Sequence, residues 1–401
     1  MSRKTTIAGG AWGWEFICSM EKKDIGIGFS ENPASEEAIK EISLRIKSNL
    51  NKSISLAIVF FTPHYKPLTL KETLHITLRP ENIFGLQAPL VIFEGRVIKR
   101  GVVVCCFSLN GSNLKEILLK ESNVEQIESI LRKALVAIGE KKEFILCCLS
   151  PRVNIHNHLR GFELSLGRGF KIFGGGFIKK YGIKNFQIAN NIIDEGASSI
   201  ILGRPLVADS EKISGFLPVG KTFKITKAAP LRNVILEINN KPASLIYKKY
   251  LEEKFETFKK TSLGSLYPIG IKDNGHYRII NVLDFLEDDS LFCIGEMKEG
   301  QEGKLMMATS VSLLEAVKQT ATRIRFEKDY DLAIVINSFI RRKILGPEAD
   351  KEIEMIKTIL GNRIKIIGFY SDYQIFLDKN IAEFTVENNN LCIVLLKYGR
   401  S

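Results

Sequence analysis

Two tandem α/β domains with mixed β-sheets are the fold class that the sequence predicts, and the stretch from Asp331 to Ile375 is the first observation behind it. It opens with the continuous apolar run Leu332 to Ile336, which is typical of a strand buried on both faces. After a break at Gly346-Pro347, apolar residues recur at helical spacing from Ile353 to Leu360. A second apolar run, Ile364 to Ile367, follows. The predicted unit is therefore strand, helix, strand.

Similar units earlier in the chain are the second observation. The apolar run Leu56 to Phe61 is followed by a helical or loop stretch, and the run Phe144 to Leu149 by a helix-competent stretch; a short apolar element with glycine then follows each. The three glycine elements are Ile83-Phe84-Gly85, Ile172-Phe173-Gly174 and Ile367-Gly368-Phe369. We therefore expect an architecture in which one strand-helix-strand unit is repeated.

The third observation is a change of pattern after Gly215. Short strand-like runs now alternate with turns such as Asn239-Asn240 and Glu299-Gly300. The best boundary lies between Lys212 and Gly220. It divides the chain into an N-terminal segment (1–24), a first domain (25–215) and a second domain (216–401).

The other elements follow in chain order from apolar periodicity and turn residues. Further strands are expected at 25–30, 91–93, 102–107, 223–226, 234–238, 277–282, 290–294 and 304–308. Helices are expected from Ser35 to about Leu50, within Asn113 to Ala137, and over His158 to Leu166, Ala243 to Thr257 and Ser312 to Phe326.

Composition indicates a soluble, folded, cytoplasmic protein. The chain has 401 residues, of which 45% are hydrophobic and 25% charged. The first residues contain Glu15 and no long apolar run, so neither a signal peptide nor membrane insertion is predicted. Cys105-Cys106 and Cys147-Cys148 lie inside apolar runs without disulfide or metal spacing, which predicts buried, reduced thiols.

The net charge of +12 raises the question of a basic binding patch. Most of the charged residues between Lys141 and Lys184 are basic, and together they could attract nucleic acid or an anionic ligand. The alternative is a solvated, lysine-rich surface. We favour the surface and expect no nucleic-acid partner, because no helix-turn-helix, zinc finger or paired aromatic platform accompanies the charge.

Three apparent functional motifs also have simpler structural explanations. Gly215 to Thr222 has the glycine, lysine and threonine spacing of a phosphate-binding loop, but a strand rather than a helix follows it. Gly174-Gly175-Gly176 could bring backbone amides to an anion, or could allow tight turning or close strand packing. His156 and His158 lack the paired spacing of a zinc site, so we expect loop histidines and neither a metal nor another cofactor.

Arg341 and Arg342 follow the buried strand of the C-terminal unit. If that strand neighbours the one ending near Gly368, a guanidinium there could hold a ligand carboxylate through two hydrogen bonds. A salt bridge to Glu348 or Glu352 is an equal alternative. No nucleophile elbow, Ser-His-Asp order or metal-spaced carboxylate cluster stands out, so catalysis has little support and no catalytic residue is assigned.

The chain resembles the FIST family, named for F-box and intracellular signal transduction proteins. Val219 to Leu396 is similar to the FIST C domain, and Ile25 to Leu206 to the FIST N domain. The N-terminal likeness depends on the helix after Gly28, the Leu56 to Phe61 strand and the Phe173-Gly174-Gly175 turn. The C-terminal likeness depends on Leu236-Glu237-Ile238-Asn239, Pro242-Ala243, Tyr247, Tyr267-Pro268-Ile269-Gly270, Gly295-Glu296, Glu299-Gly300, Arg341, Leu345-Gly346, Glu352-Ile353-Glu354 and Gly368-Phe369-Tyr370-Ser371.

The resemblance implies a cytoplasmic sensory module that binds a small ligand, such as an amino acid or another anionic or zwitterionic metabolite, and signals to a protein partner. The residues expected at the ligand are Arg341, Gly368, Tyr370, Ser371, Gln374, Gly174 and Gly175.

This chain departs from the family pattern at two places. It has Asn337-Ser338 where members commonly have Ser-Cys, and Asp372-Tyr373-Gln374 where they have Tyr-Gly-Glu. Gln374 could hydrogen-bond a ligand amine but not neutralise it. A non-catalytic scaffold with a degenerate ligand site is therefore the alternative function, and an enzyme acting on an anionic substrate at the basic segment is a third.

Overall fold

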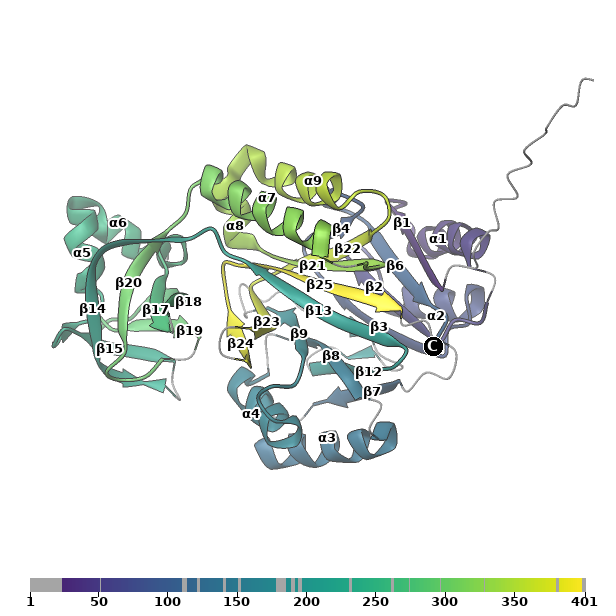
Figure 1. The fold of residues 1–401 in the computed structure, drawn as a ribbon, viewed down its shortest axis with the longest axis horizontal. Coiled ribbons are helices and arrows are strands. Elements are labelled where there is room, and N and C mark those ends of the chain that lie inside the picture. Colours follow the sequence, from purple (N-terminus) through teal and green to yellow (C-terminus); the bar gives the residue numbers. More distant parts are fainter. Residues whose placement is uncertain are drawn as a thin grey trace, which may run out of the picture.

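The computed structural model describes residues 24–398 apart from 51, 110–113, 121–122, 140–141, 151–152, 178–184, 189–191, 194–196, 231–232, 261–262, 274, 296, 328 and 380–381. Within these residues the chain forms four β-sheets with helices packed against them (Figure 1). The mixed α/β fold predicted from the sequence is confirmed. The predicted N-terminal segment lies outside the described residues except for Asp24.

Three of the sheets are built around the same unit, in which two parallel strands are joined through helix and a third strand pairs antiparallel with the first. The parallel strands and helices are β2 (Leu56–Phe61), α2 (Pro67–Thr77) and β3 (Asn82–Gln87); β8 (Lys142–Leu149), α4 (Ile155–Leu166) and β9 (Ile172–Gly176); and β21 (Leu332–Ser338), α8 (Phe339–Leu345), α9 (Ala349–Leu360) and β22 (Lys365–Ser371). The antiparallel strands are β6 (Val102–Phe107), β12 (Ala197–Gly203) and β25 (Leu391–Tyr398). The predicted repeat is therefore present.

In each unit, a glycine of the second parallel strand pairs with a residue at the corresponding position of the first. The pairs are Val59 with Gly85, Cys147 with Gly174, and Val335 with Gly368. A Cβ added to the glycine would lie 2.5, 1.9 and 2.0 Å, respectively, from the carbonyl oxygen of its partner. Only glycine permits strands to approach so closely. The third element is Ile366-Ile367-Gly368, one residue earlier than predicted.

The three sheets share one apolar core. Their facing side chains include Phe60 and Phe84 from the first sheet, Leu146 from the second, and Ile334 and Phe369 from the third. The rings of Phe60 and Phe369 lie 4.9 Å apart between centroids and join two sheets directly. Each such side chain contributes about 1.5–3 kcal/mol by leaving water. We call these three sheets and their helices the body.

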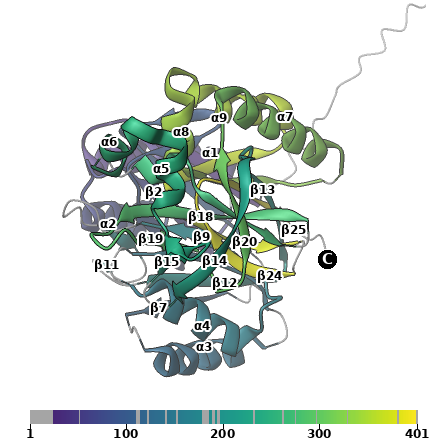
Figure 2. The ribbon, with the colours of Figure 1, turned by 90° about the vertical axis from the view of Figure 1, so that its left-hand side faces the viewer.

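The fourth sheet is a barrel that stands to one side of the body in Figure 1 and in front of it in Figure 2. Its strand β14 pairs with both β20 and β15, so the seven-stranded sheet closes on itself. Its core contains Tyr247, Phe258 and Phe285. The elements are β14 (Leu217–Ala229), β15 (Val234–Ile238), β16 (Lys241–Pro242), α5 (Leu245–Leu251), α6 (Phe255–Lys260), β17 (Ile269–Asp273), β18 (His276–Phe285), β19 (Leu291–Ile294) and β20 (Glu302–Met307).

The remaining elements complete the body. They are β1 (Ile25–Ser30), α1 (Ser35–Asn49), β4 (Val91–Phe93), β5 (Arg96–Ile98), β7 (Lys115–Leu119), α3 (Val124–Ile138), β10 (Gln187–Ile188), β11 (Ile192–Ile193), β13 (Leu206–Ile213), α7 (Ser310–Glu327), β23 (Tyr373–Asp378) and β24 (Glu383–Glu387). None of the helices in the described part of the chain combines the length and apolar character that a membrane span needs.

Segments from the two sides of residue 215 share sheets. β4 pairs with β22, β13 pairs with β25, and β23 pairs with β9. The chain leaves the body after β13, forms the barrel and returns at α7. The division of the chain at residue 215 remains a prediction.

In the stretches that contain predicted helices, the structure has one strand that the sequence did not predict, and a 3₁₀ turn divides one predicted helix. The stretch from Asn113 to Ala137 contains β7 before α3, and α3 begins where the Asn123 side chain accepts hydrogen bonds from the next backbone amides, 2.8 Å from Glu125 N. The helix predicted over Ala243 to Thr257 is divided by a 3₁₀ turn at Glu252, whose φ is +43°. The phosphate-loop lookalike lies at the start of strand β14, as its sequence context predicts.

Candidate functional site

The predicted ligand residues of the C-terminal turn lie together but are closed to solvent. Gly174 and Gly175 of β9 pair with Ile375 and Gln374 of β23. A Cβ on Gly175 would lie 3.0 Å from Ser371 Oγ, so this glycine is packed against the turn. Tyr370, Ser371 and Gln374 have no exposed surface. This geometry favours close strand packing, the alternative kept open for the triple glycine.

Polar atoms of the protein surround the Gln374 side chain. The side-chain amide can be oriented so that both its nitrogen and its oxygen have hydrogen-bond partners. The nitrogen then donates to the carbonyl oxygens of Glu387 (3.2 Å) and Asn390 (3.1 Å), and the oxygen accepts from Ser371 Oγ (3.1 Å). Tyr370 packs against Phe339, with ring centroids 5.7 Å apart, and burial raises the pKa of its hydroxyl. The ligand role of these residues remains a prediction, and the contacts present are internal.

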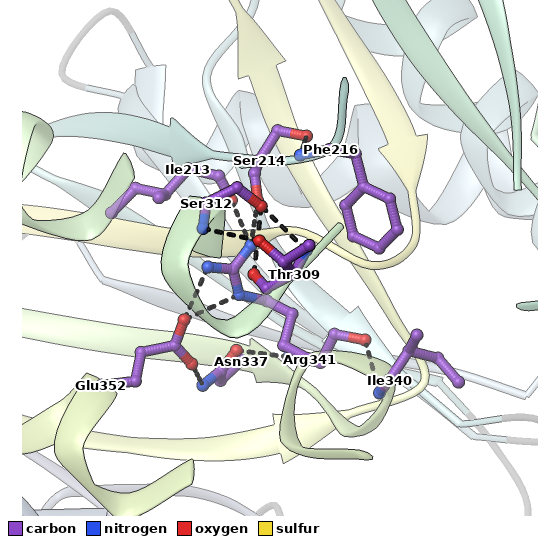
Figure 3. A network of polar contacts seen from close by, with 10 residues as sticks. Ile213, Ser214, Phe216, Thr309, Ser312, Asn337, Ile340, Arg341 and Glu352 are labelled. Carbon is purple, nitrogen blue, oxygen red and sulfur yellow. Dashed lines mark hydrogen bonds and ion pairs between the residues drawn. The ribbon is translucent and has the colours of Figure 1, made fainter. Parts of the chain in front are cut away.

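Arg341 forms the salt bridge that was the alternative to ligand binding. Its Nη2 and Nε lie 2.6 and 2.9 Å from Glu352 Oε1, and neither side chain is exposed. Its Nη1 donates to the carbonyl oxygens of Ile213 and Ser214, which connect β13 to the barrel (Figure 3). Arg342 pairs instead with Asp350 at 2.6 Å. Each guanidinium nitrogen of Arg341 therefore already has a protein partner.

The histidines and cysteines that the structure describes have no metal-site geometry. His158 is buried on α4 with Nδ1 3.0 Å from Asn154 O, whereas His156 Nε2 meets Asn233 Oδ1 of the barrel. Both histidines therefore lie in a helix rather than in the predicted loop. No cluster of three metal-ligating side chains occurs among the described residues. Burial raises the pKa of the Cys147 thiol to about 12, so this cysteine stays protonated and unreactive.

An open cavity of about 820 Å³ lies between the body and the barrel. Such a volume suits a small-molecule ligand, for which sites measure about 300–1,000 Å³. The body contributes the first two turns of α4 and most of β24; the barrel contributes Asn233 and the region of β18 and β19. The lining residues are Val153, Asn154, Ile155, His156, Asn157, Leu159, Arg160, Glu163, Arg168, Phe177, Asn233, Leu283, Phe292, Ile294, Gly295, Glu383, Phe384, Thr385 and Val386.

Alternating charges line one side of this cavity. Arg160 pairs with Glu163 at 2.8 Å, and Arg168 bridges Glu163 (2.6 Å) and Glu383 (2.9 Å). Both arginine side chains stay about half exposed, at 53% and 46%. Burial alone would raise the pKa of Glu163, but the hydrogen bonds from Arg168 and Arg160 outweigh it and lower that pKa. Two guanidinium groups and two carboxylates can thus meet a molecule that carries both charges.

Part of this charged wall falls within the basic segment between Lys141 and Lys184, which the sequence did not predict to line a cavity. Arg160, Glu163 and Arg168 were counted within the basic segment, while Lys141, Arg152, Lys179, Lys180 and Lys184 of that segment lie outside the described residues. The helical spacing of Arg160 and Glu163 could have suggested an ion pair. Nothing in the local sequence indicates that β24 and β19 lie opposite α4.

Comparison with known proteins agrees with this architecture. The model of the FIST N domain matches residues 55–241, and that of the FIST C domain matches residues 243–373. The chain belongs to the FIST family. Proteins with these domains are associated with signal transduction and the sensing of small ligands.

One similar solved structure is that of cyanuric acid hydrolase from A. caulinodans, which is 7% identical over 94% of this chain and 99% of that chain, with a TM-score of 0.38. No curated protein matches the chain.

Proposed function

We propose that this chain is a cytoplasmic sensory protein that binds a small ligand in the cavity between body and barrel. The observation that carries the proposal is the cavity itself, which is open, of ligand size and lined by both structural parts. The residues of the turn around Gln374 have no exposed surface, and Gln374 is hydrogen-bonded within the protein. The two regions are neighbours, because β24 lines the cavity and pairs with β23, the strand of Gln374.

The lining favours an amino acid or another small anionic or zwitterionic metabolite. A ligand carboxylate can displace part of the hydration of Arg160 and Arg168, and a ligand ammonium can approach Glu163 and Glu383. Apolar side chains, among them Phe177 and Phe384, cover the rest of the wall. A site with few polar groups on an apolar wall fixes the ligand orientation and excludes water.

Ligand binding can change how the barrel sits on the body. The interface next to the cavity combines apolar packing with polar contacts. Asn389 Nδ2 donates to Ser265 O at 2.8 Å, and Ile279 N to Glu387 Oε2 at 3.3 Å. Among the described residues, the side-chain oxygens of Asn281, Asn389 and Asn390 are buried without a hydrogen-bond partner. Buried polar groups without partners destabilise an interface. A modest free energy of ligand binding can therefore shift the position of the barrel on the body. A separate signalling protein would read the new surface.

The test is ligand-dependent thermal unfolding. The purified protein is screened against amino acids, small carboxylates and nucleotides, because a ligand that binds only the folded state raises the melting temperature. A stabiliser is expected for the wild type and for Arg363→Ala, which alters a surface ion pair with Asp329 outside the cavity. Arg160→Ala should lose most of the effect.

Two results would redirect the proposal. If no compound in the panel stabilises the wild type, the non-catalytic scaffold becomes the better account of the fold. Chemical turnover of a bound compound would instead make the cavity an active site, and the chain an enzyme.

A further inference from the structure

The strand β24 presents its edge, rather than one face, to the cavity. It is the terminal strand of its sheet and pairs only with β23 among the described strands. Four successive residues, Glu383 to Val386, line the cavity. Because side chains alternate between the two faces of a sheet, four in a row can meet one cavity only at the edge of the strand.

The backbone groups on the outer side of β24 are only partly used within the described part of the protein. Phe384 N donates to Arg168 O at 3.0 Å, on the side of β24 that faces away from β23. The N–H and C=O of one residue in a strand point to the same side, and every second residue repeats that direction. Phe384 C=O and both backbone groups of Val386 therefore also face away from β23. For these three groups, the described residues supply no backbone partner.

We propose that the cavity receives a short peptide in extended conformation, which adds to β24 as a further strand. This inference rests on the proposed function and specifies its ligand class. An unpaired strand edge recognises main-chain N–H and C=O groups, which a peptide has and a free amino acid lacks between its termini. Three residues extend over about 10 Å, which suits a cavity of this size.

The charges and hydroxyl of the wall fit the same occupant. Arg160 and Arg168 can meet a peptide carboxylate, and Glu163 and Glu383 its ammonium group. Thr385 Oγ1 is buried in the wall without a hydrogen-bond partner. A peptide thus offers charge complementarity at its ends and hydrogen bonds along its length.

The experiment compares alanine, leucine and phenylalanine with the tripeptides Ala-Ala-Ala, Ala-Leu-Ala and Ala-Phe-Ala by titration calorimetry on the full chain. Each tripeptide is also tested with one amide N-methylated at a time. Because alternate amides face β24, one N-methylation should weaken binding roughly 3- to 10-fold, as expected for one lost hydrogen bond, and the other should change it little.

A matched pair of protein variants tests the reciprocal contact, in which the N–H of Val386 donates to a peptide carbonyl. Val386→Pro removes the outward N–H, which proline tolerates at a strand edge, whereas Val386→Ala removes similar packing and keeps the N–H. Val386→Pro should weaken tripeptide binding roughly 3- to 10-fold relative to Val386→Ala, because the peptide carbonyl loses its N–H donor, whereas the effect of N-methylation should persist in both variants. If Val386→Pro does not fold, the N-methylated peptides decide alone.

The possible results separate this inference from the function on which it rests. Free amino acids that bind as tightly as the tripeptides, or tripeptides indifferent to both N-methylations, would overturn the peptide assignment and leave the small-ligand sensor intact. If neither class nor any other small ligand binds, both proposals fail.

Discussion

Arg341 and Glu352 form a salt bridge with no solvent exposure, and the same guanidinium holds the chain where it leaves the body for the barrel. The return connection is close by, because Thr309 and Ser312 lie in the same network (Figure 3). The pair therefore stabilises the junction between the two parts of the molecule.

Removal of one partner should be costly because it leaves the other charge buried. We expect Arg341→Ala to lower the free energy of unfolding by about 3–5 kcal/mol. Arg342→Ala is the matched control, since Arg342 pairs with the 61% exposed Asp350; it should cost about 1 kcal/mol or less. Urea unfolding measures both. Equal losses would show that burial of the Arg341 pair is not what stabilises the junction.

Because of this expected destabilisation, Arg341→Ala is not a specific test of ligand binding. Loss of binding in that variant would follow from a disturbed junction even if no ligand touches Arg341. Arg160→Ala is the better probe, because Arg160 is 53% exposed and its removal leaves Glu163 paired with Arg168.

The three register glycines give a second prediction. Gly85→Ala, Gly174→Ala and Gly368→Ala should each destabilise the fold by at least about 2 kcal/mol, because the added Cβ meets a backbone carbonyl that cannot move aside. Gly169→Ala is the control: its Cβ would meet only Ala382 O, at 3.5 Å, and it should cost less than about 1 kcal/mol. Chemical denaturation compares the four. Near-neutral substitution at the register positions would refute the close-packing explanation.

The cavity wall should show a defined pH dependence. The pKa of Glu163 is below its ordinary value of 4.5 because Arg168 and Arg160 outweigh burial. A lowered folded-state pKa contributes stability above the unfolded value and loses it as pH falls through the folded value. Glu163→Gln should therefore be less stable than wild type near neutral pH, by about 1 kcal/mol or less at this partly exposed site.

The difference between the Glu163→Gln variant and wild type should shrink in acid. Unfolding free energies measured at neutral pH and at successively lower values, down to below 4.5, provide the check. A difference that stays constant across this range would mean that the charge of Glu163 does not support the wall.

Local patterns predicted much of the fold. The strands Leu56–Phe61, Val102–Phe107 and Ile172–Gly176 coincide with apolar runs bounded by turn residues, and the repeat was visible in the recurring order of strand, helical segment and apolar-glycine element. Pairing between distant strands was not predictable, because hydrogen-bonded partners such as β4 and β22 carry no local signal of one another. The short strand β7 was not predicted.

The site was harder to predict than the fold. Arg341 and Gln374 were identified as polar residues beside a turn, but polarity alone does not distinguish a buried structural contact from a ligand contact. The cavity depends on α4, β24 and β19, which are far apart in the sequence. Its charged residues also look like ordinary surface pairs until the barrel is placed opposite them.

Hydrogen–deuterium exchange with a stabilising ligand tests most directly where that ligand binds. We expect the ligand to slow exchange in residues 154–163, 383–386 and 292–295, which form the two sides of the cavity. Residues 365–371 should show little change, since they are already buried. Protection confined to 365–375, with the cavity segments unchanged, would place the ligand at the C-terminal turn and contradict the assignment of the cavity as the sensory site.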